Sequence, residues 1–319
     1  MGLIGVDLGG TQLRVAVADD RGRLRTVLRR ATEAARGREH VINRIVAAVK
    51  DALQEDGTAP QRVRALGIGL PGPVDPAAGL VISPGNLPGF KNVPLNRILT
   101  RATGVQSFLH HDAHLAALGE HQRGAARGAS ELIYLTVSTG IGAGIILHGE
   151  LYAGAHGIAG EIGHIIVQRD GPLCTCGLRG CVEAIASGTG ISRAARELAP
   201  GAPDSVLHGL ENPAAEDVAR AARSGDTLAT SILVNAGAYL GIAIGTLINL
   251  FNPQLIVLGG SVLKAGAPLL RPMRQSMNAS SWKASRRGLR IVAPALGDDA
   301  GLIGAVEFAR LRARHARKA

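Results

Sequence analysis

The chain has 319 residues, of which 46% are hydrophobic, and its formal net charge is +10. This length and apolar content are enough for two domains with cores of their own and exclude a low-complexity protein. The positive charge is compatible with phosphates, nucleic acids or anionic membranes. However, no DNA- or RNA-binding motif accompanies it, and the only dense basic cluster is the tail, residues 310–318. We therefore expect no nucleic-acid partner.

The ends and the most apolar stretch of the chain give no sign of export or membrane insertion. The first residues lead directly into a strand, without the basic and long apolar segments of a signal peptide. The most apolar region, residues 240–258, is interrupted by Asn249, Asn252 and Pro253. This pattern predicts a buried helix followed by a buried strand rather than a membrane span. We expect a cytoplasmic protein with no membrane partner.

Two glycine-rich hairpins open the two halves of the chain. Residues 3–6 and 13–18 are predicted strands around a turn that contains Asp7, Gly9, Gly10 and Thr11. Residues 132–137 and 145–147 are predicted strands around the turn Ser138-Thr139-Gly140-Ile141-Gly142-Ala143-Gly144. Such turns direct backbone N–H groups into a concave nest that binds phosphate. The alternative for either turn alone is a tight hairpin without a ligand, but two in matching positions indicate one nucleotide held between two domains.

Between the hairpins, predicted strands and helices alternate. An apolar face over residues 41–53 predicts a helix, followed by a strand over 63–70, a helix over 95–103 and a strand over 105–109. The proline-rich loop 83–90 presents one amide, Asn86, and is either a plain surface loop or a ligand contact. Asp112 lies where the last strand ends and a helix begins. It fits a helix N-cap and also a ligand group at the carboxyl end of a strand, and the two roles are compatible.

All three cysteines, Cys174, Cys176 and Cys181, lie within eight residues of one another and follow His164. A disulfide would leave one thiol over, and a cytosolic location argues against it. Three thiolates and a histidine complete a tetrahedral zinc site, which is closed and therefore structural. Uncommitted structural cysteines are the alternative. Such a zinc site would hold in place the loop that carries Glu161, His164 and Glu183.

The remaining sequence predicts further helices and strands. Residues 227–251 form a long apolar helix, and residues 255–258 form a buried strand that ends in a third glycine turn, Gly259-Gly260-Ser261. A strand over 289–293 and a helix after Gly301 complete the chain.

These motifs together resemble the ROK family of sugar kinases and sugar-responsive repressors, and within it bacterial glucokinases and hexokinases. The resemblance covers essentially the whole chain. It rests on the two hairpin turns, on residues 70–75 and 86–89, on Asp112-Ala113, on the glycine signature from Val137 to His164, and on the three cysteines.

The resemblance implies an α/β, actin-like ATPase (ribonuclease H-like) fold with two α/β domains around a cleft. The expected N-terminal domain covers residues 1–118 and is completed by the C-terminal helix 302–319. The expected C-terminal domain covers residues 119–301 and contains the zinc loop. By the same resemblance, the protein is a homo-oligomer, either a dimer or a tetramer.

The implied activity is that of an ATP-dependent glucokinase of carbohydrate metabolism and glycolysis, which phosphorylates the 6-hydroxyl of glucose, with wider hexose use as an extension. Asp112 would be the catalytic base, and Asp7 would orient Mg²⁺ through water. The implied ATP contacts are Asp7, Gly9, Gly10, Thr11, Gln12, Ser138, Thr139, Gly140, Gly142, Gly259 and Gly260. The implied sugar contacts are Asn86, His111, Asp112, Glu161, His164 and Glu183. The implied metal ligands are His164, Cys174, Cys176 and Cys181.

Several positions depart from the family pattern. His111 and His114 replace common asparagines, Gln12 replaces a common lysine, and Phe90 replaces a common tryptophan. Because an imidazole reaches a hydroxyl differently from an amide, His111 leaves the preferred hexose open, with mannose, fructose and N-acetylhexosamines as alternatives. Polyphosphate is an alternative donor. A sugar-sensing regulator without catalysis is the other alternative, although the family's repressors carry a helix-turn-helix before the first hairpin, which here begins at residue 3.

Overall fold

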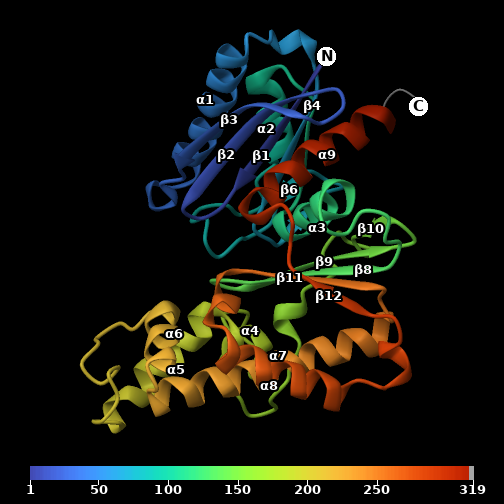
Figure 1. The fold of residues 1–319 in the computed structure, drawn as a ribbon. Helices are drawn as coiled ribbons and strands as arrows, with labels where there is room; N and C mark the ends of the chain where they lie inside the picture. Colours follow the sequence, from blue (N-terminus) through green and yellow to red (C-terminus); the bar gives the residue numbers. More distant parts are fainter. Residues whose placement is uncertain (316–319) are drawn as a thin grey trace. The chain divides into compact units, whose positions relative to one another are not determined.

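The computed structural model describes residues 1–315, and the chain in it divides into two compact units (Figure 1). Unit 1 comprises residues 1–130, 144–160 and the chain from 294 onward, and unit 2 comprises residues 131–143 and 161–293. Each unit combines strands of a mixed sheet with helices. The predicted α/β class is therefore confirmed.

Unit 1 is built on a five-stranded sheet in the order β3-β2-β1-β4-β7. Strands β3, β2 and β1 are antiparallel neighbours, and β1, β4 and β7 are parallel. The strands of this unit are β1 Gly2–Leu8, β2 Gln12–Asp19, β3 Leu24–Ala31, β4 Val63–Leu70, β5 Val74–Asp75, β6 Leu80–Val81, β7 Ser107–His111 and β10 Glu150–Tyr152. Its helices are α1 Arg38–Asp56, α2 Leu95–Thr103, α3 Asp112–Arg123 and α9 Ala300–His315.

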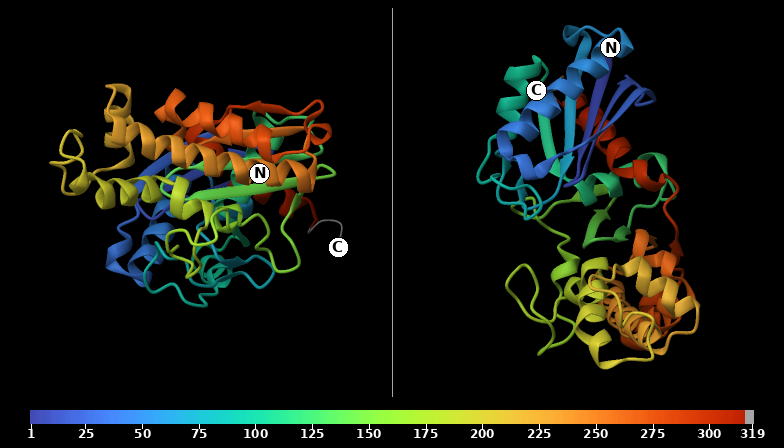
Figure 2. Two further views of the ribbon diagram at one scale, coloured as in Figure 1. Left: turned by 90° about the horizontal axis from the view of Figure 1, so that it is seen from below. Right: turned by 90° about the vertical axis from the view of Figure 1, so that its left-hand side faces the viewer.

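The two faces of this sheet are covered by different helices, which follows from the alternation of side chains along a strand. In β1, Ile4 and Val6 belong to the core that contains Val41 and Ile45 of α1. Leu3, on the opposite face, packs with residues of α9. Gly5 lets α9 approach closely, because a Cβ at Gly5 would lie 2.6 Å from the side chain of Val306. Figure 2 shows α1 and α9 on opposite sides of these strands.

A buried carboxylate joins the end of α3 to the segment that leads into α9. Glu120 is fully buried and accepts hydrogen bonds from the backbone N–H groups of Ala125 at 2.7 Å, Ala295 at 3.1 Å and Leu296 at 2.8 Å. A buried acceptor of this kind satisfies backbone donors that would otherwise lose their hydration. Glu120 therefore holds together two segments that are 175 residues apart in the sequence.

Replacing Glu120 with glutamine should lower the free energy of unfolding by about 2 kcal/mol, because the amide offers one acceptor oxygen where the carboxylate offers two. Urea unfolding at neutral pH measures the change, with Glu55→Gln on the exposed face of α1 as the matched control. Equal stability of the two variants would contradict this role for Glu120.

Unit 2 is formed around the second sheet, whose order is β10-β9-β8-β11-β12. Its strands are β8 Leu132–Val137, β9 Ile141–Leu147, β11 Leu255–Gly259 and β12 Arg290–Val292, and the division between the units falls within β9, after Ala143. Its helices are α4 Val182–Ala186, α5 Gly188–Leu198, α6 Ala215–Arg223, α7 Thr227–Phe251 and α8 Ala267–Ser280. In chain order, both sheets run third, second, first, fourth, fifth.

Helix α7 is the centre of the core of unit 2. Ile232, Leu240 and Ile244 are buried in one cluster with Leu135 of β8 and Ile256 of β11. By length and composition alone α7 could cross a membrane. Its packing here agrees with the predicted buried helix followed by a buried strand, and α8 runs alongside it (Figure 1).

The boundaries of the units differ from the predicted domains. The predicted division at residue 118 falls inside α3, and that at residue 302 falls inside α9. Helices are not divided between units, so the structure places these divisions after Ser130 and before Pro294. Residues 144–160, which the prediction gave to the second domain, belong to unit 1. Residues 316–319 of the predicted final helix lie outside the described residues.

Two arginines of the basic cluster at the end of the chain contact other side chains, although Arg312 and Arg314 are exposed. Arg310 is paired with buried Glu307 and is only 13% exposed, and Arg312 lies over the rings of Phe108 and Phe308. Residues 316–318 of the cluster lie outside the described residues.

Candidate active site

Parallel pairing brings the candidate residues of unit 1 to one edge of its sheet. Asp7 in β1 is paired with Gly69 in β4, and Leu70 in β4 is paired with His111 in β7. Because parallel strands end at the same edge, Asp7, His111 and the following Asp112 lie at the carboxyl ends of neighbouring strands. This edge is where α/β folds bind ligands.

Asp7 is a buried carboxylate with one cationic partner. It is 7% exposed and forms an ion pair with Arg14, the residue directly opposite it in the β1–β2 hairpin. Burial raises the pKa of Asp7 from 3.8 to about 6; Arg14 opposes this shift, and the nearby negative charge of Asp112 adds to it. The site therefore holds a carboxylate that is costly to ionise until a cation stabilises it.

The turn after Asp7 is held by its own backbone and by Thr32. The N–H of Gly9 donates to the carbonyl of Gln12 at 2.8 Å. The hydroxyl of Thr32 donates to the carbonyl of Gly9 at 2.7 Å, and its N–H donates to the carbonyl of Thr11 at 2.8 Å. Gly10 lies against Asn86, since a Cβ there would be 3.3 Å from the Asn86 side chain. The predicted phosphate turn and the predicted sugar amide are thus neighbours.

His111, and not Asp112, is the N-cap of α3, which corrects the predicted cap. The Nδ1 atom of His111 accepts the N–H of Ala113 at 3.2 Å, and Asp112 is the first helical residue. Oδ1 of Asp112 also accepts the Ala113 N–H, at 2.6 Å. A neutral imidazole that accepts at Nδ1 carries its proton on Nε2. The Asp112 side chain remains 38% exposed, so its other oxygen can receive a proton from a ligand hydroxyl.

In unit 2, the ends of β8 and β11 bring the other predicted nucleotide residues together. These strands are parallel neighbours, and the N–H of Ser261 donates to the Ser138 hydroxyl at 3.2 Å. Gly260 has a φ of 109° and lies against the carbonyl of Val137, so any side chain would be both strained and obstructed. Gly259 ends β11, Gly140 lies in the turn between β8 and β9, and Gly142 lies at the start of β9. Thr139 is exposed, and its carbonyl accepts the Thr189 hydroxyl at 2.8 Å.

Glu183 of α4 anchors the second glycine turn. Its Oε2 accepts the N–H of Ile141 at 2.8 Å, and a Cβ on Gly140 would lie 2.6 Å from the same oxygen. Glu161 is exposed and precedes a short 3₁₀ turn, Ile162–His164, in which the N–H of His164 donates to the Glu161 carbonyl at 3.1 Å. Glu161, His164 and Glu183 are thus presented by neighbouring elements of unit 2.

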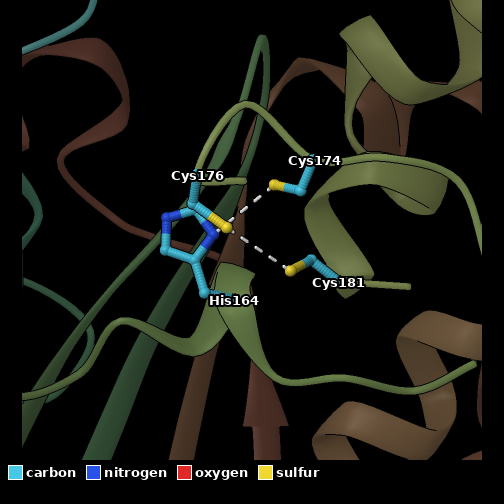
Figure 3. A group of neighbouring side chains, drawn as sticks. All are labelled: His164, Cys174, Cys176 and Cys181. Atoms are coloured by element: carbon cyan, nitrogen blue, oxygen red, sulfur yellow. Dashed lines mark hydrogen bonds between the residues drawn. The ribbon is translucent and has the colours of Figure 1, made fainter. Parts of the chain in front are cut away.

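The predicted metal ligands converge in the same unit (Figure 3). One ligand atom from each of His164, Cys174, Cys176 and Cys181 lies within 4.8 Å of the others. Nδ1 of His164 is 3.7 Å from Sγ of Cys174, and Sγ of Cys176 is 3.7 Å from Sγ of Cys181. Ligands at about 2.3 Å from a tetrahedral zinc would be about 3.8 Å apart. The four residues therefore fit a closed Cys₃His zinc site.

The cysteine loop is folded by its own backbone. The N–H of Cys174 donates to the carbonyl of Leu178 at 2.8 Å, and the N–H of Gly177 donates to the carbonyl of Cys174 at 3.0 Å. Gly180 has a φ of 75° and lies directly against the carbonyl of Gln168. Only glycine fits this position, which returns the chain to Cys181.

Arg14 and Ser261 were not predicted as site residues, although each contacts a predicted site residue. Arg14 could have been found from the hairpin register, because Asp7 and Arg14 are equally far from the turn that joins β1 and β2. The contact of Ser261 with Ser138 depends on the pairing of β8 with β11, which are more than 100 residues apart, and has no local signal.

Comparison with known proteins identifies the family of this chain. The model of the ROK family matches residues 3–312. The chain belongs to the ROK family. A glucokinase of Thermotoga maritima is 37% identical to this ROK protein over 97% of its chain and 98% of the relative. Repressors are more distant: a xylose repressor of Caldicellulosiruptor bescii is 27% identical, and the alignment covers 95% of this chain and 77% of the repressor.

Solved structures of ROK enzymes have the same fold. A ROK hexokinase from Thermus thermophilus superposes with a TM-score of 0.82 at 35% identity, covering 99% of this chain and all of that one. A ROK glucokinase from Streptomyces griseus, solved in complex with glucose and AMPPNP, gives a TM-score of 0.80 at 33% identity, covering 98% of this chain and all of that one. The expected actin-like ATPase fold class is therefore confirmed.

Replacing Asp7 with asparagine should change how the free energy of unfolding depends on pH. Because the pKa of Asp7 in the folded protein is raised from 3.8 to about 6, folding favours its protonated form, and this stabilisation is lost as pH rises through that interval. The variant should gain about 2 kcal/mol relative to the wild type between about pH 4 and about pH 7.5.

Denaturant unfolding without metal or nucleotide at both pH values measures this change. Asp20→Asn, at an exposed turn position, is the control and should follow the wild type. A stability difference between Asp7→Asn and the wild type that stays constant with pH would show that Asp7 ionises normally.

Proposed function

We propose that this ROK protein is a glucokinase, which transfers the terminal phosphoryl group of ATP to the 6-hydroxyl of glucose. The observation that carries the proposal is the 37% identity to a glucokinase over nearly the full length of both chains. The candidate residues described above support it, because each unit supplies the groups that such a reaction needs: a half-exposed carboxylate, glycine turns, and polar side chains for sugar hydroxyls.

In unit 1, we propose that Asp112 contacts the sugar hydroxyl that becomes phosphorylated. One oxygen of its carboxylate accepts the Ala113 N–H, which fixes the orientation of the group, and the other would accept the proton of the sugar's primary alcohol. His111 would donate its Nε2–H to a neighbouring hydroxyl, and the amide of Asn86 would bind another. A fixed, partly solvated carboxylate is suited to general-base catalysis.

In unit 2, we assign further hydroxyl contacts to Glu161, Glu183 and the free ring nitrogen of His164. Glu183 has one oxygen committed to Ile141 and one available. Hydroxyl groups held by several charged or polar side chains are oriented for in-line transfer, and their number sets the selectivity between hexoses.

The nucleotide would be held by the glycine turns. The proposed contacts are Asp7, Gly9, Gly10, Thr11 and Gln12 of unit 1, and Ser138, Thr139, Gly140, Gly142, Gly259 and Gly260 of unit 2. Backbone N–H groups in such turns stabilise the charge of the transferring phosphoryl group. Asp7 would hold Mg²⁺ through water, and the bound Mg²⁺ would neutralise charge on the phosphates. The raised pKa of Asp7 is consistent with this role, because a bound cation would stabilise the ionised carboxylate.

The purified protein should phosphorylate glucose with ATP, and Asp112→Asn should lower kcat by about 10² to 10⁴, the usual effect of removing a positioned base. A coupled assay over glucose, mannose, fructose and N-acetylglucosamine, with ATP and then with polyphosphate, measures the activity and its selectivity. Asp20→Asn is the control. Unchanged kcat in Asp112→Asn would reject the role of Asp112.

A regulator that binds sugar without catalysis is the second candidate, because the chain is also 27% identical to a xylose repressor. The same assay separates the two. A protein that binds glucose in calorimetry but transfers no phosphate from ATP or polyphosphate to any hexose of the panel would be a sugar sensor.

We also propose that His164, Cys174, Cys176 and Cys181 hold a structural Zn²⁺. Their 3.7 Å spacings and the closed ligand set support an ion that organises the loop without activating water. Through His164 the ion would keep Glu161 and Glu183 in place.

The purified protein should contain about one zinc per chain, and Cys181→Ser should lose it and bind glucose more weakly. Elemental analysis by mass spectrometry measures zinc, and calorimetry measures glucose binding. His40→Asn, in α1 of unit 1, should retain the metal. Active wild-type protein without zinc would contradict this proposal.

The same function implies a cytoplasmic enzyme of carbohydrate metabolism, which we propose acts in glycolysis as a homo-oligomer, either a dimer or a tetramer. The product of glucose phosphorylation is the substrate class that glycolysis consumes.

A further inference from the structure

Three histidines surround the start of the helix that carries Asp112. His110 and His111 end β7, and His114 lies in the first turn of α3. His110 is 4% exposed and His114 is 1% exposed. The ring of His110 is also packed edge-on against Phe308 of α9, with 5.4 Å between ring centroids. Buried imidazoles need hydrogen-bond partners, so their contacts indicate what they hold in place.

His114 bonds a segment that is 45 residues further along the chain. Its Nε2 lies 2.6 Å from the carbonyl oxygen of Ala159. Because a carbonyl oxygen only accepts, the proton of His114 lies on Nε2. Its Nδ1 faces Nδ1 of His110 at 3.2 Å, and that atom of His110 already accepts the N–H of His111 at 2.9 Å.

The ring of His114 is neutral near pH 7. Burial, together with the neighbouring charge of His111, lowers the pKa of His114 to about 4, while the bond to Ala159 and the charge of Asp112 act in the opposite direction. Burial also lowers the pKa of His110 well below its usual value. With one proton per ring, His114 must place that proton on Nε2 to keep the Ala159 bond, which fixes its tautomer.

Ala159 ends a short loop of unit 1 that leads into a proposed sugar residue. Its N–H donates to the carbonyl of Ala153 at 2.9 Å, so the bond from His114 closes the loop of residues 153–159 onto α3. Two residues later the chain reaches Glu161. In α3, His114 is two residues after Asp112. One hydrogen bond therefore connects the helix of the proposed base to the segment that presents a proposed sugar ligand.

We propose that His114 is a positioning residue, which holds the loop of residues 153–159, the loop that leads into Glu161, against the helix of Asp112 through its Nε2–H bond to the Ala159 carbonyl. The kinetic part of this inference rests on the proposed function, whereas the structural part does not.

Three substitutions of His114 distinguish the loss of the bond to Ala159 from the general effect of replacing a buried imidazole. His114→Gln places an N–H donor about where Nε2 of histidine lies. His114→Asn places its donor only about as far as Nδ1, and His114→Leu has no donor. If the bond to Ala159 is what matters, the Gln variant should behave like the wild type, and the Asn and Leu variants should both lose the bond.

Hydrogen exchange of the free protein tests the structural part. The Ala159 amide and its neighbours in residues 153–160 should exchange at least about tenfold faster in the Asn and Leu variants than in the wild type, and His114→Gln should retain the protection. Equal exchange in the Gln and Asn variants, or unchanged exchange in the Leu variant, would overturn the inference whether or not the protein is a kinase.

Steady-state kinetics tests the kinetic part. The KM for glucose should rise at least about tenfold in His114→Asn and His114→Leu, with a smaller effect on kcat and an unchanged KM for ATP, and His114→Gln should restore the KM. A uniform loss of kcat in all three variants would contradict a positioning role. Inactivity of the wild type on every hexose would instead reject the proposed function and leave the exchange experiment to decide on His114.

Discussion

The parallel pairing of β1, β4 and β7 is the constraint from which the site of unit 1 follows. Strands that run in the same direction end at the same edge, so Asp7 at the end of β1 and Asp112 just after β7 lie at that edge on either side of β4, where the charge of Asp112 acts on Asp7. Gly5 of β1 and Gly67 of β4 are paired with each other. Both lie where α9 approaches the sheet closely, and α9 closes the face opposite α1.

Two carboxylates at one edge repel each other, and the structure gives them different environments. Burial raises the pKa of Asp7 to about 6, although the ion pair with Arg14 acts to lower it. Asp112 keeps 38% of its side chain exposed and receives a backbone N–H of the helix that it begins. Under the proposed function, Asp7 would accept a cation and Asp112 would accept a hydroxyl proton. This division of roles comes from burial and hydrogen bonding, since the residue type is the same.

Local signals in the sequence predicted much of this. The glycine turns, the helix over 227–251, the strand end at Asp112 and the Cys₃His set all depend on residues close together in the chain, and the structure has each of them. Contacts between residues far apart in the sequence could not be predicted from such local signals. The division of the chain through β9, the partner of Ser138 and the bond from His114 to Ala159 depend on contacts between distant segments. The cap of α3 was assigned to Asp112 because Asp is the commoner cap, whereas His111 occupies that position.

The central claim is that phosphate from ATP is attached to the oxygen at carbon 6 of glucose, the hydroxyl that we propose Asp112 deprotonates. The most direct measurement is carbon NMR of the product formed from ATP and glucose labelled with ¹³C at carbon 6. We expect the labelled carbon to show coupling to ³¹P, because phosphate is attached to its oxygen. A phosphorylated product in which carbon 6 shows no such coupling would contradict the account.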